Sequence, residues 1–325
     1  MLDRRTLLAA TVAAAASPAS GRAQGTWPER AVRVVVPWPP GGSTDVLARL
    51  LSDRLAHRFG QPFVVENKPG AGGNIGTDAI AKAAPDGYTM GPVTVGGWTI
   101  NQYLYARLAY DPDRDIVPVS MHWELPNVFV VPAQHVPARD LSGFIAWAKA
   151  RPGGVSYGTP GIGTTPHLCG AMFAGRAGLD ATHVPFRGAA QTIPALLAGD
   201  VSFALDNLAS YVPAIRDGRM RALAVTSPER WPTLPEVPTM AEAGLADFVV
   251  TSWCAFAVPR GVARATVARA NAAMREAVAD PDLQDRFLRA GARAVWTEPE
   301  GVAARVERER PMWREMVRLS GARLE

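Results

Sequence analysis

The sequence predicts an α/β protein in which two lobes with mainly parallel sheets surround a ligand cleft. Three observations support this class. Short runs rich in Val alternate with segments of helical periodicity along most of the chain. Several of these runs are apolar throughout, as strands buried on both faces of a parallel sheet are. Two of the turns that join a strand to a helix are rich in Gly, and such turns form the ligand crevice of open parallel sheets.

The first part of the alternation is a βαβαβ unit. The strand at 32–37 is mostly Val, and the helix that follows shows apolar residues at helical spacing from 46 to 59. A strand at 62–67, a helix at 75–84 and a strand at 87–95 complete the unit. This order is typical of a parallel sheet with helices on both faces.

The second part repeats the alternation. Strands are expected at 127–132, 154–160, 182–186, 201–207 and 221–227, with helices at 141–151, 166–175 and 190–200. Pro194 is expected in the first turn of the last of these helices, where proline costs no hydrogen bond. An apolar strand at 251–259 then precedes helices at 264–279, 282–290 and 299–319.

This pattern divides the chain into two lobes. The halves part near 121–127, and the number of strands suggests that the chain after residue 250 returns to the first lobe. We therefore expect one lobe from 24–124 plus 254–325 and the other from 125–253. The two crossings would form a hinge beside the cleft.

The first 23 residues have the order of a signal peptide. Arg4 and Arg5 precede a short apolar run at 7–16, and small residues lead to Gly21-Arg22-Ala23. The arginine pair is compatible with either the general secretory or the twin-arginine route. The whole chain of 325 residues has a formal charge of +4, and half of it lies in this segment. Without a basic run interleaved with aromatic residues, nucleic-acid binding is not supported.

The loop from Pro39 to Asp45 has the composition of a small anion site. Pro40, Gly41 and Gly42 follow a strand, and the two glycines allow a ligand close to the backbone. Ser43 or Thr44 can cap the next helix, whose first amides are unpaired and whose N-terminal end is partly positive. For this loop alone, a tight turn that only closes a βα unit is the favoured explanation.

A second loop of the same kind at 158–168 favours the anion site. It includes Thr159, Gly161 and Gly163, and it offers Thr164 or Thr165 as a cap with Pro166 in the first turn. His167 is expected as a neighbour of the cap or a ligand contact. A carboxylate between the two loops would meet two helix N-termini.

Other candidate residues have two interpretations. Arg187, beside Gly188 after a strand, either forks onto a carboxylate or is a solvated surface residue. Asp206 either accepts from a ligand or caps the helix after it. Trp38 and Trp98 lie on crevice-side loops and are candidate pocket walls, whereas Trp123 is expected in the core.

The sequence lacks the motifs of common catalytic sites. No G-x-S-x-G is present, and the five His residues do not have zinc spacing. We therefore expect no enzymatic activity, no catalytic residue, no cofactor and no metal. Cys169 and Cys254 either form a disulfide or are free residues of the core, because sequence does not give their separation.

Several of these motifs together resemble the solute receptors of tripartite tricarboxylate transporters, the Bug family of periplasmic binding proteins. They are "VVPWPPGGSTDVLARLLSDRL", "GQPFVVENKPGAGGNIGTDAIAKAAPDGYTM", "YDPDRDIVPVS", "HVPFRGAAQ", "MRALAVTS" and "LPEVPTMAEAG". The match extends over the whole chain after the signal peptide.

The resemblance implies a type II periplasmic binding fold that acts as a monomer. It implies capture of a small carboxylate, whether a di- or tricarboxylate, an amino acid or an aromatic acid, and delivery to two integral-membrane subunits. Loops 39–45 and 158–167 would contact the ligand from opposite lobes. Arg187 replaces the usual Lys, Trp38 replaces Phe or Tyr, and Gly97-Trp98 replaces smaller or polar residues. A receptor of the same fold that reports ligand occupancy to a membrane sensor is the alternative.

Overall fold

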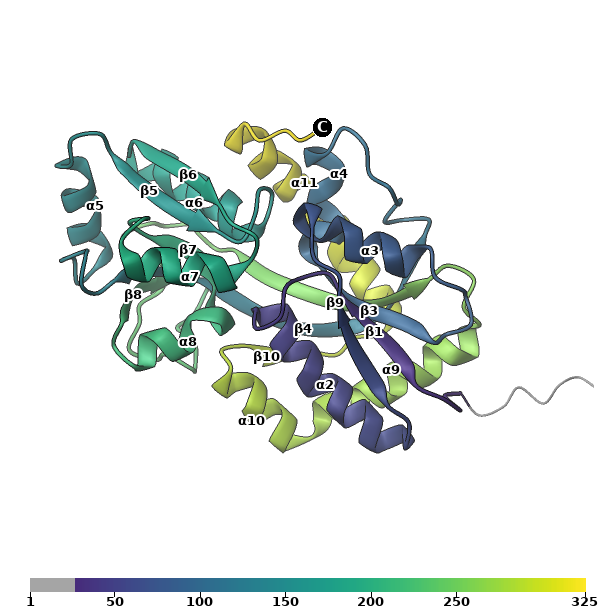
Figure 1. Ribbon diagram of the computed structural model, residues 1–325. Coiled ribbons are helices and arrows are strands. Elements are labelled where there is room, and N and C mark those ends of the chain that lie inside the picture. Colours follow the sequence, from purple (N-terminus) through teal and green to yellow (C-terminus); the bar gives the residue numbers. More distant parts are fainter. Residues whose placement is uncertain (1–26) are drawn as a thin grey trace, which may run out of the picture.

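A computed structural model describes residues 27–325, and Figure 1 shows their arrangement. The predicted signal peptide lies outside the described residues. Within them, no helix is both long enough and apolar enough to cross a membrane.

The first half of the chain forms a parallel βαβαβ unit, as predicted. β1 pairs in parallel with β2 on one side and with β3 on the other. Val34 and Val36 of β1 pack into one hydrophobic cluster, whereas Val35 packs into the cluster on the opposite face of the sheet. Both faces are therefore buried, which explains the continuous Val run. The elements are β1 (Val32–Val36), α2 (Ser43–Phe59), β2 (Phe63–Asn67), η2 (Ala71–Gly73), α3 (Asn74–Ala81) and β3 (Thr89–Thr94).

Two long strands join the halves of the molecule. β4 (Ile116–Pro132) and β9 (Thr251–Pro259) run antiparallel and pair from Ile116 to Pro126. The rest of β4 pairs with two strands of the second half. Residues 121–127, where the sequence suggests that the halves part, therefore lie in the middle of a continuous strand, and Figure 1 shows both strands crossing between the halves.

The second half repeats the alternation of strands and helices. β5 pairs in parallel with β6, while β7 and β8 both run antiparallel to β4. Of the two crossing strands, β9 runs antiparallel to β3 in the first half, whereas β4 opposes β7 and β8 in the second half. The elements are α5 (Leu141–Lys149), β5 (Val155–Thr159), α6 (Thr165–Ala177), β6 (Ala181–Pro185), α7 (Ala189–Ala198), β7 (Ala204–Asn207), α8 (Leu208–Arg216) and β8 (Met220–Val225).

The C-terminal segment packs mainly on the first half. α9 (Arg264–Ala279) and α10 (Pro281–Arg289) contact α2, and β10 (Arg293–Ala294) pairs with β4. The last helix, α11 (Pro299–Ser320), contacts β4 and also α6 of the second half. The division into lobes 24–124 plus 254–325 and 125–253 remains a prediction.

Two local expectations are corrected, and the alternative left open for the two cysteines is decided in favour of free core residues. Residues 96–104 form η3 (Gly96–Ile100) and α4 (Asn101–Leu104), where the sequence suggested no element. Pro194 lies in the interior of α7 rather than in its first turn, because the helix begins at Ala189. Cys169 and Cys254 are both free and buried, and Cys169 Sγ accepts a hydrogen bond from Asn127 Nδ2 (3.1 Å).

Candidate functional site

A pocket with about 690 Å³ of empty space, partly open to solvent, lies between the two halves. Loops after β1 and β3, the starts of α6, α7 and α8, and the two crossing strands contribute to its walls. Of the sixteen residues predicted to bind a ligand, ten line it: Trp38, Pro40, Gly42, Ser43, Thr44, Gly163, Thr164, Thr165, Gly188 and Asp206.

The first Gly-rich loop presents the N-terminus of α2 to the pocket, but not through a side-chain cap. Gly42 is the N-cap residue, and Ser43 and Thr44, predicted as caps, lie in the first turn. The amide of Ser43 instead donates to Ser210 Oγ (3.1 Å), which belongs to α8 in the other half. The two serine hydroxyls are also 2.7 Å apart. The start of α2 is therefore held by a contact across the pocket.

Asp45 does not line the pocket, but it holds the first loop in shape. Its carboxylate accepts hydrogen bonds from the Gly41 amide (3.0 Å) and from Asn67 Nδ2 (2.8 Å), and it forms an ion pair with Arg49 (3.0 Å). Burial by itself would raise the pKa of Asp45, but these hydrogen bonds and the charge of Arg49 outweigh it and lower the pKa. Gly41 also lies outside the lining; its φ of +82° suits glycine.

The second Gly-rich loop presents the N-terminus of α6, and here the predicted cap is confirmed. Thr164 is the N-cap residue, and its hydroxyl accepts from the His167 amide (3.4 Å). The same hydroxyl donates to the Gly161 carbonyl (2.7 Å). Pro166 lies in the first turn, as expected.

His167 and Thr159 lie behind this loop rather than in the pocket lining. His167 Nδ1 accepts from the Gly163 amide (3.1 Å), so its imidazole must be neutral at that nitrogen. His167 stacks on His183 with ring centroids 4.0 Å apart, and His183 Nε2 is 2.7 Å from Thr159 Oγ1. Burial lowers the pKa of His167 to about 4. Burial, followed by the effect of the neighbouring His167, lowers the pKa of His183 to about 3.

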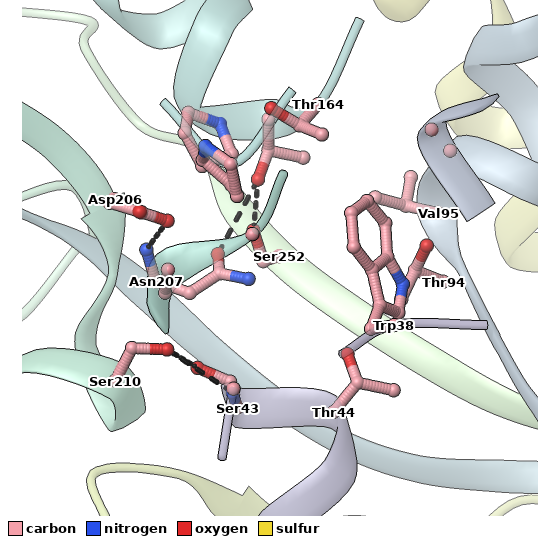
Figure 2. Close-up of a pocket in the computed structure, with 18 of the residues that line it drawn as sticks. Trp38, Ser43, Thr44, Thr94, Val95, Thr164, Asp206, Asn207, Ser210 and Ser252 are labelled. Carbon is pink, nitrogen blue, oxygen red and sulfur yellow. Dashed lines mark hydrogen bonds between the residues drawn. The ribbon is translucent and has the colours of Figure 1, made fainter. Parts of the chain in front are cut away.

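A group of polar side chains, most of them in the pocket lining, connects the second loop to the crossing strands. Thr165 Oγ1 hydrogen bonds with Ser252 Oγ and lies 3.5 Å from the amide oxygens of Asn127 and Asn207. Ser252 Oγ also donates to Asn127 Oδ1 (3.2 Å). These contacts join α6, β4, β7 and β9 at the base of the pocket, which Figure 2 shows in part.

Two further helix N-termini face the pocket, and the sequence reasoning did not identify them. Gly188, Ala189 and Ala190 contribute the start of α7, while Asn207 and Ser210 contribute the start of α8. The signal was present, because each helix follows the C-terminal end of a parallel strand. Four helices of nine residues or more thus begin at the pocket.

Asp206 lines the pocket and is fully buried. Its Oδ1 accepts from the Asn207 amide (2.6 Å) and its Oδ2 from the Tyr211 hydroxyl (2.9 Å). Burial raises the pKa of Asp206 to about 7, and these two hydrogen bonds only partly oppose the shift. The N-cap of α8 is Asn207, so Asp206 does not have the capping role expected for it.

Two predicted residues lie away from the pocket. Arg187 is exposed and outside the lining; its backbone amide donates to Gln191 Oε1 (3.0 Å). Trp98 is buried in the core, where its Nε1 donates to the Val93 carbonyl (3.0 Å). The chain enters a helix directly at Gly96 after β3, which turns Trp98 inward.

Other lining residues had no sequence signal. Trp123 and Trp253 come from the crossing strands β4 and β9, and Asn101 begins α4. Trp123 was expected in the core, and it is indeed almost fully buried while also lining the pocket. Within residues 27–325, no group of three or more His, Cys, Asp or Glu side chains could hold a metal ion.

Residues 47–316 match the family model for tripartite tricarboxylate transporter family receptors. The chain belongs to this family. The match begins just after the first Gly-rich loop and covers most of the chain, which confirms the resemblance that the sequence motifs indicated.

Solved structures of receptors in this family share the fold. An R. palustris protein solved with adipate superimposes with a TM-score of 0.89 at 34% identity, covering 92% of this chain and 100% of that one. The periplasmic binding protein BugD gives a TM-score of 0.86 at 32% identity, covering 92% and 100%. MatC from Rhodopseudomonas palustris with bound malate gives 0.83 at 34% identity, covering 90% and 100%. The periplasmic binding protein fold is thereby confirmed.

Proposed function

We propose that the protein captures a small carboxylate in the pocket between its halves and delivers it to the two membrane subunits of a tripartite tricarboxylate transporter. The observation that carries this proposal is the arrangement of α2, α6, α7 and α8, all of which begin at the pocket. Each N-terminus contributes about half a positive charge and several unpaired amides.

Carboxylates satisfy such donors well. Hydrogen bonds from amides and hydroxyls to an ionised oxygen are roughly twice as strong as those between neutral groups. Ser43, Thr44 and Thr164 add hydroxyls beside these amides. The receptors solved with adipate and with malate bind acids of this kind.

Binding without reaction is part of the proposal. The described residues that line the pocket include no His or Lys that could activate a Ser or Thr hydroxyl. The nearest imidazole, that of His167, accepts from the Gly163 amide and is stacked on His183. Its contacts support the loop rather than a hydroxyl of the pocket lining.

Isothermal titration calorimetry with adipate and with its diamide tests the recognition of charge. We expect the acid to bind at least tenfold more tightly, since the diamide keeps the length but loses the ionised oxygens. Product analysis after prolonged incubation checks for turnover. Equal affinities for acid and diamide, or conversion of the acid, would contradict the proposal.

The burial of Asp206 predicts a pH dependence of binding. Because its pKa is raised to about 7, Asp206 is neutral below that pH and becomes negative above it, beside a bound carboxylate. We expect adipate affinity to fall, by roughly tenfold, as pH rises from about 6 to 8.5. Asp206→Asn should flatten this dependence, whereas exposed Asp200→Asn should leave it unchanged.

Export and delivery complete the proposal. We infer that residues 1–23 are removed on export to the periplasm and that the mature protein acts as a monomer. N-terminal sequencing of the periplasmic fraction should begin near Gln24. Uptake of a labelled acid by cells that express the two membrane subunits, with and without the receptor, tests delivery. Ligand-dependent gene expression without any change in uptake would instead favour a sensory role.

A further inference from the structure

The pocket has two chemically different sides. Figure 2 shows Asp206, Asn207, Ser210 and Ser43 on one side and Trp38 with Val95 on the other. We call the second side the apolar wall; it comprises Trp38 and Val95. Thr94 is a polar residue at its edge. A ligand that spans the pocket therefore meets hydroxyls and helix N-termini at one end and mostly carbon at the other.

The apolar wall offers no charge for a second anionic group. Among the described residues that line the pocket, the one charged side chain is that of Asp206, which is itself acidic and lies on the polar side. A second carboxylate against Trp38 and Val95 would lose its hydration without gaining a cation. Burying an ion under these conditions is costly, whereas burying carbon is favourable.

Trp38 is held rigidly at this wall. Its carbonyl accepts from Asn67 Nδ2 (2.9 Å), and the same amide nitrogen donates to Asp45. A Cβ on Gly73 would lie only 3.4 Å from Trp38 Cζ2 and 3.5 Å from Cε2, so the backbone packs closely against the ring. The indole is thus fixed by the network that shapes the first Gly-rich loop.

The Nε1 atom of Trp38 is buried and has no hydrogen-bond partner within the described protein, and the same holds for Trp123. An unpaired buried N–H is unfavourable. Because Nε1 of Trp38 is buried away from the pocket surface, a ligand contacts the carbon atoms of this indole rather than its N–H.

We propose that the ligand is an aromatic monocarboxylic acid whose carboxylate meets the helix N-termini and whose ring packs against Trp38, the residue that determines this specificity. The inference rests on the proposed function, since it assumes that the pocket takes a carboxylate. A flat aromatic ring can stack on an indole and gain a quadrupole interaction that a saturated ring of the same size lacks.

Calorimetry with three acids tests the ligand class on the unmodified mature protein. Benzoate has a planar ring, cyclohexanecarboxylate has a ring of similar size that is not planar, and adipate has a second carboxylate. We expect benzoate to bind roughly threefold to tenfold more tightly than cyclohexanecarboxylate and more tightly than adipate.

Variants of Trp38 assign the selectivity to its ring. Trp38→Phe should keep the preference for benzoate over cyclohexanecarboxylate, and Trp38→Leu should abolish it while changing the affinity for cyclohexanecarboxylate by less than about threefold. Trp147→Leu, which removes an indole on α5 outside the pocket, is the matched control and should have no effect.

The results separate the two proposals. If adipate binds more tightly than benzoate, or the two ring acids bind equally, the aromatic specificity is wrong while carboxylate capture stands. If none of the acids binds, the proposed function itself fails. A preference for benzoate that survives in Trp38→Leu overturns the role of Trp38.

Discussion

The two Gly-rich loops present helix N-termini to the same pocket but are built on different chemistry. Loop 39–45 is braced by the carboxylate of Asp45, and the first amide of its helix is bound by Ser210 from the other half. Loop 158–167 is braced by the neutral imidazole of His167 and capped by its own Thr164. One helix start thus depends on a contact across the pocket, whereas the other is complete within its own half.

The two loops share a Gly-rich motif, but chemically different side chains hold them in shape. A carboxylate remains an acceptor down to acid pH when its pKa is lowered, as that of Asp45 is. An imidazole loses its acceptor when it is protonated. We therefore expect the two loops to respond differently to substitution and to pH.

The largest difference between the two loops should be in ligand affinity, when the glycine that precedes each helix is substituted. Gly163 has a φ of +76°, and a Cβ there would lie 1.9 Å from Leu104 Cδ2 in the other half. Gly42 has a φ of −79°, and its nearest contact would be the Pro39 carbonyl at 3.8 Å. Gly163→Ala should weaken adipate binding by at least about tenfold, and Gly42→Ala by less than about threefold, in calorimetry.

Two further variants separate strain from collision at Gly163. Gly41→Ala has a similar φ of +82° but meets nothing within 4 Å, so it reports the cost of the backbone conformation alone. Leu104→Ala combined with Gly163→Ala removes the colliding atom and should restore part of the affinity. If Gly41→Ala weakens adipate binding as much as Gly163→Ala does, the collision with Leu104 of the other half is not the cause of the weaker binding.

The next largest difference should be in stability, because different side chains support the two loops. Asp45→Asn removes a buried charge that accepts from Gly41 and Asn67 and pairs with Arg49, and should lower the free energy of unfolding by about 1–3 kcal/mol. Thr164→Ala removes an N-cap and should cost about 1 kcal/mol. Urea unfolding at pH 7.5 measures both. A larger loss for Thr164→Ala would reverse the proposed order.

The pH dependence should be specific to the second loop. Because burial lowers the pKa of His167 to about 4 in the folded protein, the unfolded chain takes up the proton first as pH falls. The share of stability that depends on His167 should therefore be lost between about pH 6.5 and pH 4, by roughly 1–3 kcal/mol. Protonation at Nδ1 would also break the bond to the Gly163 amide.

His167→Asn tests this account, because its side-chain oxygen can accept from Gly163 without titrating. The fall in stability between pH 6.5 and pH 4 should shrink in this variant, although His183 and the buried His122 keep their own shares. His57→Asn changes an exposed histidine of α2 and is the control. An unchanged slope in His167→Asn would show that the acid sensitivity arises elsewhere.

The smallest effect on ligand affinity should come from removing the contact between Ser43 and Ser210, which joins the two halves. Ser210→Ala removes the acceptor of the Ser43 amide, but water can replace it in this half-buried position. We expect a loss of about 0.5–1 kcal/mol in binding free energy for adipate and a smaller change in stability. Ser142→Ala, on exposed α5, is the matched control. A loss above tenfold would make this contact as important as the Gly163 fit.

Local sequence determined most elements and the general position of the site. The strand at 251–259 and the helix at 264–279 have the predicted bounds, because an apolar run and an amphipathic period are properties of neighbouring residues. Thr164 as a cap and both Gly-rich loops at the pocket followed for the same reason: strand, turn and helix signals lie within a dozen residues.

Tertiary structure alone decided which chemistry faces the pocket. Ser43 and Ser210 meet although they are 167 positions apart, and Trp123, Ser252 and Trp253 reach the lining because two strands cross between the halves. Arg187 turned out to lie outside the lining, although its sequence neighbour Gly188 is part of it. Periodicity specifies which face of an element is buried, but not which distant element covers that face. The loops were therefore predictable, whereas their partners across the pocket were not.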